Sequence, residues 1–553
     1  MAASPSLKPS LKPSLKPSPK PFPRAITQKL GLRHWMNRVL EECNRANDGF
    51  GIDAVHDLRV ALRRCRSLAD GLRAIDPDPS WKQMKTAGKK LFQALGDLRD
   101  MQVMQEWIEK LSDEKPGESP NPTGEPPSSD DSSGQRFSGD ALATRLFDHI
   151  QRREAECKQH AFKDLNQFDR KQWRHWCRTL PQRASRVRPG SPVYLHLALE
   201  KWTAAYDLHK RAMRTSSQVA LHQLRIGIKR FRYTVENFLP QQHAKWGDDL
   251  KELQDLLGEV HDLDVLWATA KAIDHPVDAL PDAETRRRWH EKLTAERAWR
   301  IARYREKMVG RHSLWRVWRA QLPSGPQLRA AAMSRLRTWA AYLDPDFSHS
   351  RRVAHLALLL YDGLNHARLL TPQATPTDPD SDPRAVLQAA ALMHDVGKSK
   401  SQENHHKISY RMIRTLPLPL GWSARELELA AVVARHHRGA LPRPGAKPMQ
   451  TLDLPDRRQA MLLAGILRLA IALDKPPATN TTETTPRLEV GLPPAVAPNH
   501  SVVVRVAGYS ALDRSAESVA AARHLLETML RRSILVRPLR TPPVRRQFPR
   551  KVA

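Results

Sequence analysis

The sequence predicts a mainly α-helical protein: a duplicated helical bundle, then an all-α domain, then a small C-terminal α+β module. Three observations predict this class. Apolar residues recur at helical spacing through most of the chain before residue 474. A long segment within this helical region occurs twice. Beyond residue 486, short runs such as "RLEVGL", "SVVVRVAG" and "SILVRPL" are typical of strands, and a helical pattern separates the last two.

Polar breaks rich in proline and glycine divide a chain of 553 residues, which is too long for one hydrophobic core. The chain begins with repeats of S-L-K-P, and proline at this density disfavours helix and sheet. The expected segments are a disordered Lys/Pro-rich arm at 1–28, a helical domain at 29–321 with halves at about 29–185 and 193–321 and a polar insert at 113–135, a second helical domain at 328–476, the α+β module at 486–538 and a basic tail at 539–553.

The charge of the chain narrows the classes of partner. Ninety Lys and Arg residues outweigh 59 Asp and Glu residues, for a formal net charge of +31. Such an excess favours polyanions, namely nucleic acid, polyphosphate or an anionic membrane surface. No stretch of the sequence reaches the roughly 18 apolar residues of a membrane span, and the four cysteines show no metal-binding spacing. We therefore expect a cytoplasmic protein with no membrane partner.

Two segments, "VHDLRVALRRCR" (55–66) and "LHQLRIGIKRFR" (221–232), repeat a histidine and basic residues at identical spacing. On a helix with about 100° per residue, the basic positions form one row and the apolar positions form another. Neither basic row contains a carboxylate. Such a row is either a solvated surface or a binding site for an anion. Its duplication favours the anion site, because a solvated surface does not need a fixed pattern. Arginine in particular suits phosphate oxygens. The rows comprise His56, Arg59, Arg63 and Arg66 in the first copy, and His222, Arg225, Lys229 and Arg232 in the second.

A second pair of segments extends the repeat. "KKLFQALGDLRDMQVM" (89–104) matches "KELQDLLGEVHDLDVL" (251–266), and each segment begins with a lysine, Lys89 or Lys251. Duplication of a helical unit predicts two related bundles that meet about a pseudo-twofold axis. The two basic rows are then expected to face each other.

The pattern H-x-x-R-V-x-x-R-R-x-R followed by L-G-x-x-x-D resembles the CHAD domain, the conserved histidine α-helical domain, over about residues 29–320. The resemblance implies a duplicated antiparallel helical fold with a basic central cleft that binds inorganic polyphosphate. Metal binding by the histidines is disfavoured, because each half has one such histidine among many cations. The resemblance implies these ligands: His56, Arg59, Arg63, Arg66, Lys89, His222, Arg225, Lys229, Arg232 and Lys251.

The second helical domain is rich in histidine, and its His-Asp doublet in "AAALMHDVGKSK" resembles the HD phosphohydrolase superfamily. In that superfamily the set H…HD…D binds a divalent metal, here Mn²⁺ or Mg²⁺. In members with two metal ions further histidines contribute, and His405, His406, His436 and His437 are placed to do so. The resemblance implies a metal site of His349, His394, Asp395, His406 and His436, with His394 and Asp395 as catalytic residues if the domain is active.

Segments such as "HHKISYRMI" and "ARHHRGALP" are similar to the C-terminal domain of the exopolyphosphatase/guanosine pentaphosphatase family, over about residues 330–540. That family performs its chemistry in an actin-like domain, and a CHAD-like region stands in its place here. The final aspartate of the HD set is replaced by Ile471, although Asp474 follows within one helical turn. Isoleucine cannot bind a metal, so the sequence leaves a binding-only HD-like domain and an active one both open.

These observations predict a protein that binds inorganic polyphosphate and associates with polyphosphate granules. The alternative is a metal-dependent HD phosphohydrolase that acts on polyphosphate or nucleotide phosphates, with the CHAD-like region delivering the substrate. Nucleic acid is a less favoured partner, because the tryptophans lie at helix-packing spacing and do not form an obvious stacking surface.

Overall fold

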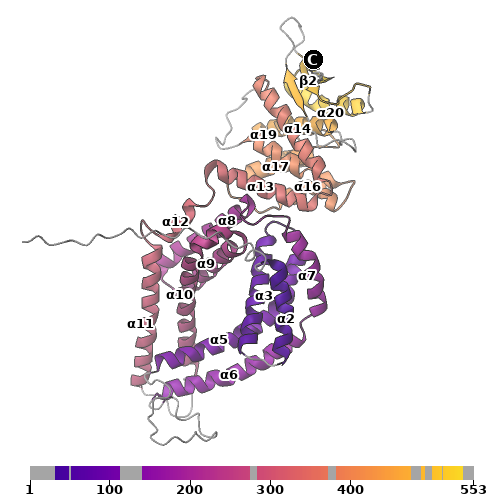
Figure 1. Cartoon of the computed structure of the whole chain (residues 1–553). Helices are drawn as coiled ribbons and strands as arrows, with labels where there is room; N and C mark the ends of the chain where they lie inside the picture. Colours follow the sequence, from indigo (N-terminus) through magenta and orange to yellow (C-terminus); the bar gives the residue numbers. More distant parts are fainter. Residues whose placement is uncertain are drawn as a thin grey trace, which may run out of the picture.

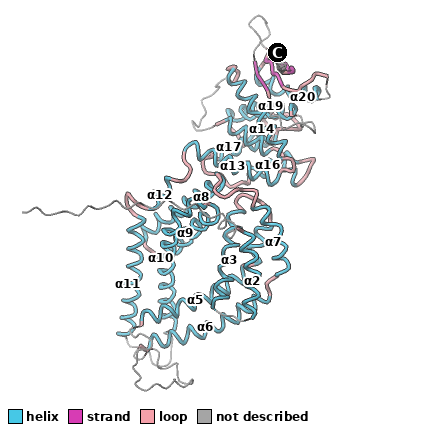
Figure 2. The backbone as a smooth tube through the Cα atoms, in the orientation of Figure 1, coloured by secondary structure: helices cyan, strands magenta, loops and turns pink. Residues whose placement is uncertain are grey.

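The computed structural model describes residues 31–48, 52–112, 137, 140–273, 283–370, 382–474, 487–491, 501–512 and 515–539. The arm predicted at 1–28, the insert at 113–135 and all but the first residue of the predicted basic tail lie outside these residues. The fold is mainly α, as predicted, with a small α+β module near the C-terminus (Figures 1 and 2). In the described part of the chain, no helix has the length and apolarity needed to cross a membrane.

The first half of the N-terminal domain pairs α2 with α3 and α5 with α6, while α7 packs on α2. Its helices are α2 (Leu32–Asp48), α3 (Ile52–Leu72), α4 (Ser80–Ala87), α5 (Lys89–Leu111), α6 (Ala141–Asn166) and α7 (Arg170–Ala184).

The second half repeats this arrangement, with α8 against α9, α9 against α10 and α10 against α11. Helices α3, α5, α9 and α10 lie around a common centre in Figure 1. The helices of this half are α8 (Pro192–Thr215), α9 (Gln218–Phe238), α10 (Pro240–Ile273), α11 (Ala283–Met308) and α12 (Leu314–Ala320).

The apolar rows of the repeated segment are buried, as their spacing indicates. On α3 the row includes Leu58 and Leu62, and on α9 it includes Leu224 and Ile228. Burial of one face leaves the basic row on another face of the same helix. The amphipathic pattern therefore fixes which way the cations of α3 and α9 point.

Helices α3 and α9 approach each other closely where Gly71 meets Phe238. A Cβ atom at position 71 would overlap the Phe238 ring, which is buried and stacked on Tyr194. Nearby, the Asn237 amide donates a hydrogen bond to Ser67 Oγ over 2.9 Å. This contact between the two halves sets the separation of the two basic rows.

The C-terminal region joins the first domain through α13 (Gly325–Leu343), which packs on α8. Arg335 of α13 is buried and forms an ion pair with Glu200, and its guanidinium also donates to the Ala74 carbonyl over 3.2 Å. The Tyr342 hydroxyl donates to the Arg183 carbonyl over 2.8 Å. A buried, paired arginine at this junction holds the two regions together.

The second helical region forms its own hydrophobic core around α15, α17 and α19. Its helices are α13 (Gly325–Leu343), α14 (Phe347–His366), α15 (Pro383–Met393), the 3₁₀ turn η1 (Val396–Ser399), α16 (His405–Arg414), α17 (Ala424–Arg435), α18 (Lys447–Gln450) and α19 (Leu454–Leu473).

The α+β module has the strand order β1-β2-β3. Strand β2 is antiparallel to β1 and parallel to β3, and Val504 lies opposite Val490 and Val536. Helix α20 connects the parallel pair and packs on α19. The elements are β1 (Leu488–Gly491), β2 (Val502–Val506), α20 (Ser515–Leu530) and β3 (Ile534–Pro538).

Candidate functional site

The basic rows of α3 and α9 converge on each other. The pKa of Lys229 falls to about 8, first because of burial and then because of the charges of Arg225, Arg63 and Arg59. Burial and the neighbouring Arg63 also lower the pKa of Arg59, although the charge of Asp100 opposes the shift. Arg59 and Arg63 come from α3, whereas Arg225 and Lys229 come from α9. We call these four residues the central basic cluster.

The repeated glycines lie beside this cluster. Gly96 of α5 faces Arg59, and a Cβ atom at position 96 would lie 3.8 Å from Arg59 Nη2. Gly258 of α10 faces Arg225 in the same way, at 3.9 Å from Nε. The glycine of the L-G-x-x-x-D motif, on α5 and on α10, thus lies against an arginine of α3 or α9.

Carboxylates from α5 and α10 also reach the cluster. Asp100 Oδ1 lies 3.8 Å from Arg59 Nη2 and remains accessible to water. Burial raises the pKa of Asp262 to about 6; the charge of Arg225 opposes this rise, and those of Asp100 and Glu259 add to it. The rows themselves contain no carboxylate, but the facing helices supply them. Sequence reasoning missed these partners, although the repeated aspartate of the L-G-x-x-x-D motif was a signal that could have indicated them.

The other predicted ligands divide into those near the cluster and those away from it. Arg232 and Lys251 both interact with Asp255, as does Arg63. His222 lies beside His261, with 3.3 Å between their Nδ1 atoms, and the charge of Arg225 contributes to the lowered pKa of His261 after burial. These contacts place Arg232, Lys251 and His222 at the margins of the cluster.

Three predicted ligands lie farther out. Arg66 donates to the Lys85 carbonyl over 2.7 Å and stacks on Phe92, so it contributes to packing between α3, α4 and α5. His56 and Lys89 are exposed near the starts of α3 and α5. Tyr233 of α9, which no sequence pattern indicated, lies beside Arg63 and Lys229 of the cluster.

In the second region, four histidines surround one carboxylate. His394 Nε2 lies 3.3 Å and His349 Nε2 lies 4.0 Å from Asp395 Oδ2. On the other side, His405 Nε2 and His437 Nε2 lie 3.2 Å and 3.8 Å from Asp395 Oδ1. The carboxylate is therefore shared between two groups of possible metal ligands, one on each oxygen.

Hydrogen bonds orient all four rings. His394 Nδ1 lies 2.8 Å from the Ala391 carbonyl, and His437 Nδ1 lies 2.7 Å from the Ala434 carbonyl. His405 Nδ1 contacts the Gln402 carbonyl at 2.5 Å. A carbonyl accepts only from a protonated nitrogen, so these three Nδ1 atoms carry a proton and each Nε2 atom lies on the side of the ring that faces Asp395. This arrangement is typical of histidines that ligate metals.

Asp474 orients the fourth ring. Its Oδ2 lies 2.7 Å from His349 Nδ1, and it also accepts two hydrogen bonds from Arg352 over 2.8 Å. Ile471, at the position of the usual final aspartate, is partly buried against the hydrophobic core. Asp474 therefore orients a histidine of this site, and its own oxygens are engaged with Arg352 and His349.

The structure brings together a different pair of histidines from the pair that the sequence indicated. His405 and His437 face Asp395, whereas His406 and His436 lie beside Arg435. Burial first, and then Arg435, lowers the pKa of both His406 and His436 to about 4. The geometry thus groups His405 and His437, in place of His406 and His436, with Asp395, while His349 and His394 form a second group with the same aspartate.

The residues of this cluster fit a divalent transition metal. Burial would raise the pKa of Asp395, but hydrogen bonds and charge from His394, Lys398 and His437 hold it well below its usual range. The carboxylate is thus ionised, as a metal ligand must be. Four imidazoles and one carboxylate suit Mn²⁺ and similar metals better than Mg²⁺, which prefers oxygen ligands. We call His349, His394, Asp395, His405 and His437 the histidine cluster.

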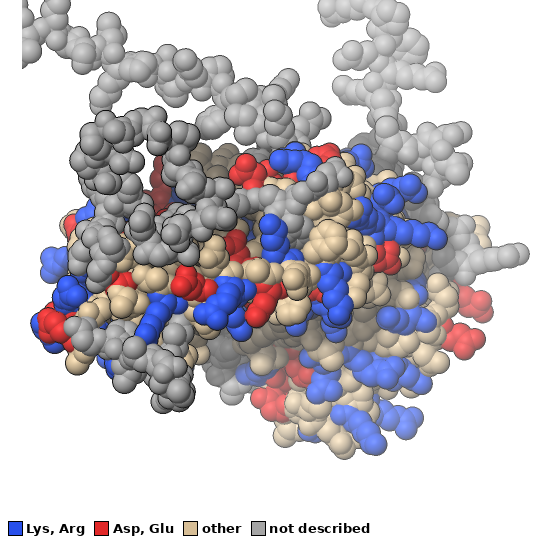
Figure 3. Space-filling view, turned by 90° about the horizontal axis from the view of Figure 1, so that it is seen from below, with Lys and Arg blue, Asp and Glu red and all other residues tan. Residues whose placement is uncertain are grey.

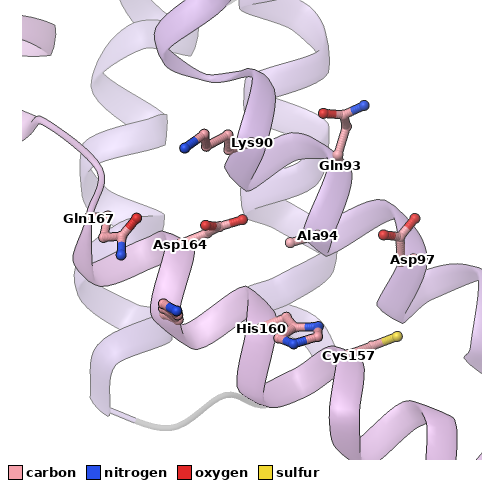
Figure 4. Close-up of a pocket in the computed structure, with 9 residues that line it drawn as sticks. Lys90, Gln93, Ala94, Asp97, Cys157, His160, Asp164 and Gln167 are labelled. Carbon is pink, nitrogen blue, oxygen red and sulfur yellow. The ribbon is translucent and has the colours of Figure 1, made fainter.

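Two other surface features lie apart from these sites. A cavity of about 460 Å³ lies between α5 and α6, where Figure 4 shows Asp97 of α5 opposite Cys157 of α6. Its walls mix cations and carboxylates, so it presents no single charge to a ligand. Figure 3 shows Lys and Arg interspersed with Asp and Glu over the lower face of the molecule. On that face, the positive charge of the chain is spread out.

Comparisons with known families agree with both resemblances. Residues 32–271 match the family described as CHAD domain, and residues 329–491 match the family described as Ppx/GppA phosphatase, domain III. The central basic cluster lies within the first match, and the histidine cluster lies within the second. No curated protein compared with the chain is similar to it. The architecture of a CHAD domain followed by a domain of the Ppx/GppA type is therefore confirmed.

Proposed function

We propose that this chain, in which a CHAD domain precedes a Ppx/GppA-type domain III, binds inorganic polyphosphate through the central basic cluster. The observation that carries the proposal is the convergence of the two rows: Arg63 of α3 and Lys229 of α9 both approach the Tyr233 ring, and the charges of Arg59 and Arg225 also reach Lys229. Burial, and then the repulsion from these arginines, lowers the pKa of Lys229. A polyanion between α3 and α9 would remove this repulsion and add charge-assisted hydrogen bonds.

The chemistry of the site favours a thin phosphate chain over nucleic acid. Proteins that bind single-stranded nucleic acids stack bases on aromatic side chains. Here the large tryptophans Trp173, Trp246, Trp315 and Trp318 are buried in the core. The central basic cluster offers guanidinium and ammonium groups for phosphate oxygens, and both matched families are consistent with a phosphate-chain ligand.

Charge reversal tests the proposal. Replacement of Arg59, Arg63, Arg225 and Arg232 with Glu should abolish retention on immobilised long-chain polyphosphate. A matched control reverses four exposed cations away from the cluster, Lys171, Arg174 and Arg178 of α7 and Arg211 of α8. The control changes the net charge equally and should be retained. Equal retention of both variants would refute the assignment, and RNA added at fixed ionic strength should compete weakly.

A second function is favoured by the histidine cluster, namely metal-dependent hydrolysis of a phosphate ester or anhydride. His349, His394 and Asp395 would hold one ion, and Asp395, His405 and His437 would hold another. The chemistry supplied by such metals is polarisation of a phosphoryl oxygen and activation of water. Lys398 Nζ lies 2.5 Å from Asp395 Oδ2 and would place a positive charge beside the phosphate. The CHAD domain would then act as the substrate-binding module.

Metal content and turnover separate the two functions. The enzyme hypothesis predicts that the purified protein binds Mn²⁺ and releases phosphate from polyphosphate or nucleotides, and that Asp395→Asn and His394→Ala abolish both. Bound metal without turnover would favour a binding role for the histidine cluster. Polyphosphate retention should survive both substitutions, because the central basic cluster lies in the other domain.

A further inference from the structure

Tyr233 of α9 lies beside two cations of the central basic cluster. Arg63 Cζ is 5.9 Å and Lys229 Nζ is 6.0 Å from the centre of its ring. Only 9% of Tyr233 is exposed, and its hydroxyl has no hydrogen-bond partner in the structure. Arg63 Nε is also buried without a partner. Two buried donors, on neighbouring side chains from different helices, are therefore unsatisfied.

Unsatisfied buried donors are uncommon and cost free energy. The cost is recovered if a ligand supplies the acceptor. An acceptor placed between Arg63 and Lys229 must also tolerate two positive charges, which favours an anion. The chemistry of the location therefore indicates an anionic oxygen, and a phosphoryl oxygen is the anionic oxygen that polyphosphate offers.

The pseudo-twofold repeat does not duplicate this feature. Ser67 occupies the position in the first copy that Tyr233 occupies in the second. The Ser67 hydroxyl donates to the Arg64 carbonyl over 3.0 Å and accepts from the Asn237 amide over 2.9 Å. Because Ser67 is satisfied within the protein, the unsatisfied hydroxyl makes the site asymmetric.

We infer that Tyr233 and Arg63 form a phosphate subsite within the central basic cluster. The inference rests on the proposed polyphosphate function and extends it. The Tyr233 hydroxyl and the Arg63 Nε–H group donate to one phosphoryl group, while Lys229 supplies charge beside it. Since the neutral phenol and the guanidinium come from different helices, they fix one phosphate of the chain in position. The other cations contact neighbouring phosphates less specifically.

A substitution that removes only the hydroxyl provides the test. Tyr233→Phe should weaken the affinity for long-chain polyphosphate by about tenfold, as expected when a hydrogen bond to a charged group is lost. The slope of log affinity against log salt should stay unchanged, because the variant removes no charge. Lys229→Met should instead reduce the magnitude of the slope by about 0.7. Tyr206→Phe, whose ring contacts Trp202 and Trp315, serves as the matched control and should bind as the wild type does.

The possible results are distinct. Tyr233→Phe removes a group that has no partner, so its melting temperature should equal or exceed that of the wild type. If the wild type binds polyphosphate and Tyr233→Phe binds it equally well, the subsite is refuted, but the proposed polyphosphate function is not. A loss of affinity with a reduced salt slope would also overturn the subsite, because the effect would then arise from displaced cations. Failure of the wild type to bind polyphosphate would refute the function on which the subsite depends.

Discussion

Lys229 is the residue whose environment departs most clearly from that of a surface lysine. Its pKa of about 8 results from burial and from three arginines, Arg225 on its own helix and Arg63 and Arg59 on α3, while Asp100 of α5 opposes the shift. The unfolded chain holds lysine protonated to a much higher pH. The folded state therefore holds mutually repelling positive charges at neutral pH, and a bound polyanion would reduce this repulsion.

This environment predicts pH-dependent binding. A bound polyanion raises the pKa of Lys229, so binding above pH 8 takes up a proton. The affinity for polyphosphate should fall about tenfold between pH 7 and pH 9. Lys229→Arg keeps its charge over this range, and its affinity should stay nearly constant. Calorimetry in buffers of different ionisation enthalpy measures the proton uptake, and equal pH profiles for the two proteins would contradict this role of Lys229.

Asp474 is expected to strengthen metal binding without being a metal ligand itself. It holds His349 through Nδ1, as carboxylates that orient metal-binding histidines do. Asp474→Ala should weaken Mn²⁺ binding by about 10- to 100-fold. Equilibrium dialysis of Mn²⁺ measures the loss.

Neighbouring histidines supply the controls for the metal site. His437→Ala should lose metal, whereas His436→Ala should retain it, since His436 lies beside Arg435. Comparable losses in the two variants would contradict the histidine cluster as defined by geometry.

The choice between neighbouring histidines shows what the sequence could not provide. His405 and His406 are adjacent, as are His436 and His437, and their residue types are identical. Backbone carbonyls of Gln402 and Ala434 orient His405 and His437 toward Asp395. Such contacts depend on the ends of α16 and α17, which no sequence pattern located to within a residue. In contrast, the doublet His394 and Asp395 was recognisable, because its motif is continuous.

At the scale of elements, helical periodicity predicted the repeated helices well. Its apolar rows are buried on α3 and α9, and its basic rows meet. The periodicity of one helix carries no information about its neighbours, however. The spacing of the basic rows therefore did not reveal that Asp100 of α5 and Asp262 of α10 interact with these rows.

The contact between α3 and α9 yields a matched pair of glycine substitutions. Gly71→Ala places a methyl group against the immobile Phe238 ring and should destabilise the protein by about 1–3 kcal/mol. Gly96→Ala meets only Arg59 Nη2 at ordinary contact distance, and it should stabilise α5 by about 0.5–1 kcal/mol. Thermal unfolding of both variants checks the prediction. A stabilising Gly71→Ala would show that the two helices are less closely packed than described.

At the scale of the whole molecule, the sequence predicted a duplicated helical domain, a second helical domain and an α+β module. The repeat made the first domain recognisable, and the change from helical to strand periodicity marked the last. The junction was not predictable, because Arg335, Glu200 and Ala74 are far apart in the sequence and no local pattern links them. Burial of this ion pair couples the domain that carries the central basic cluster to the domain that carries the histidine cluster.

The dependence of polyphosphate affinity on salt tests the central claim most directly. If the basic rows of α3 and α9 bind polyphosphate, the logarithm of the affinity should fall linearly with the logarithm of the salt concentration, because phosphate contacts release counterions. Replacement of Arg59, Arg63, Arg225 and Lys229 with Met should reduce the magnitude of that slope by about 3, at roughly 0.7 for each lost phosphate contact. An unchanged slope in this variant would mean that the polyphosphate is held elsewhere on the protein.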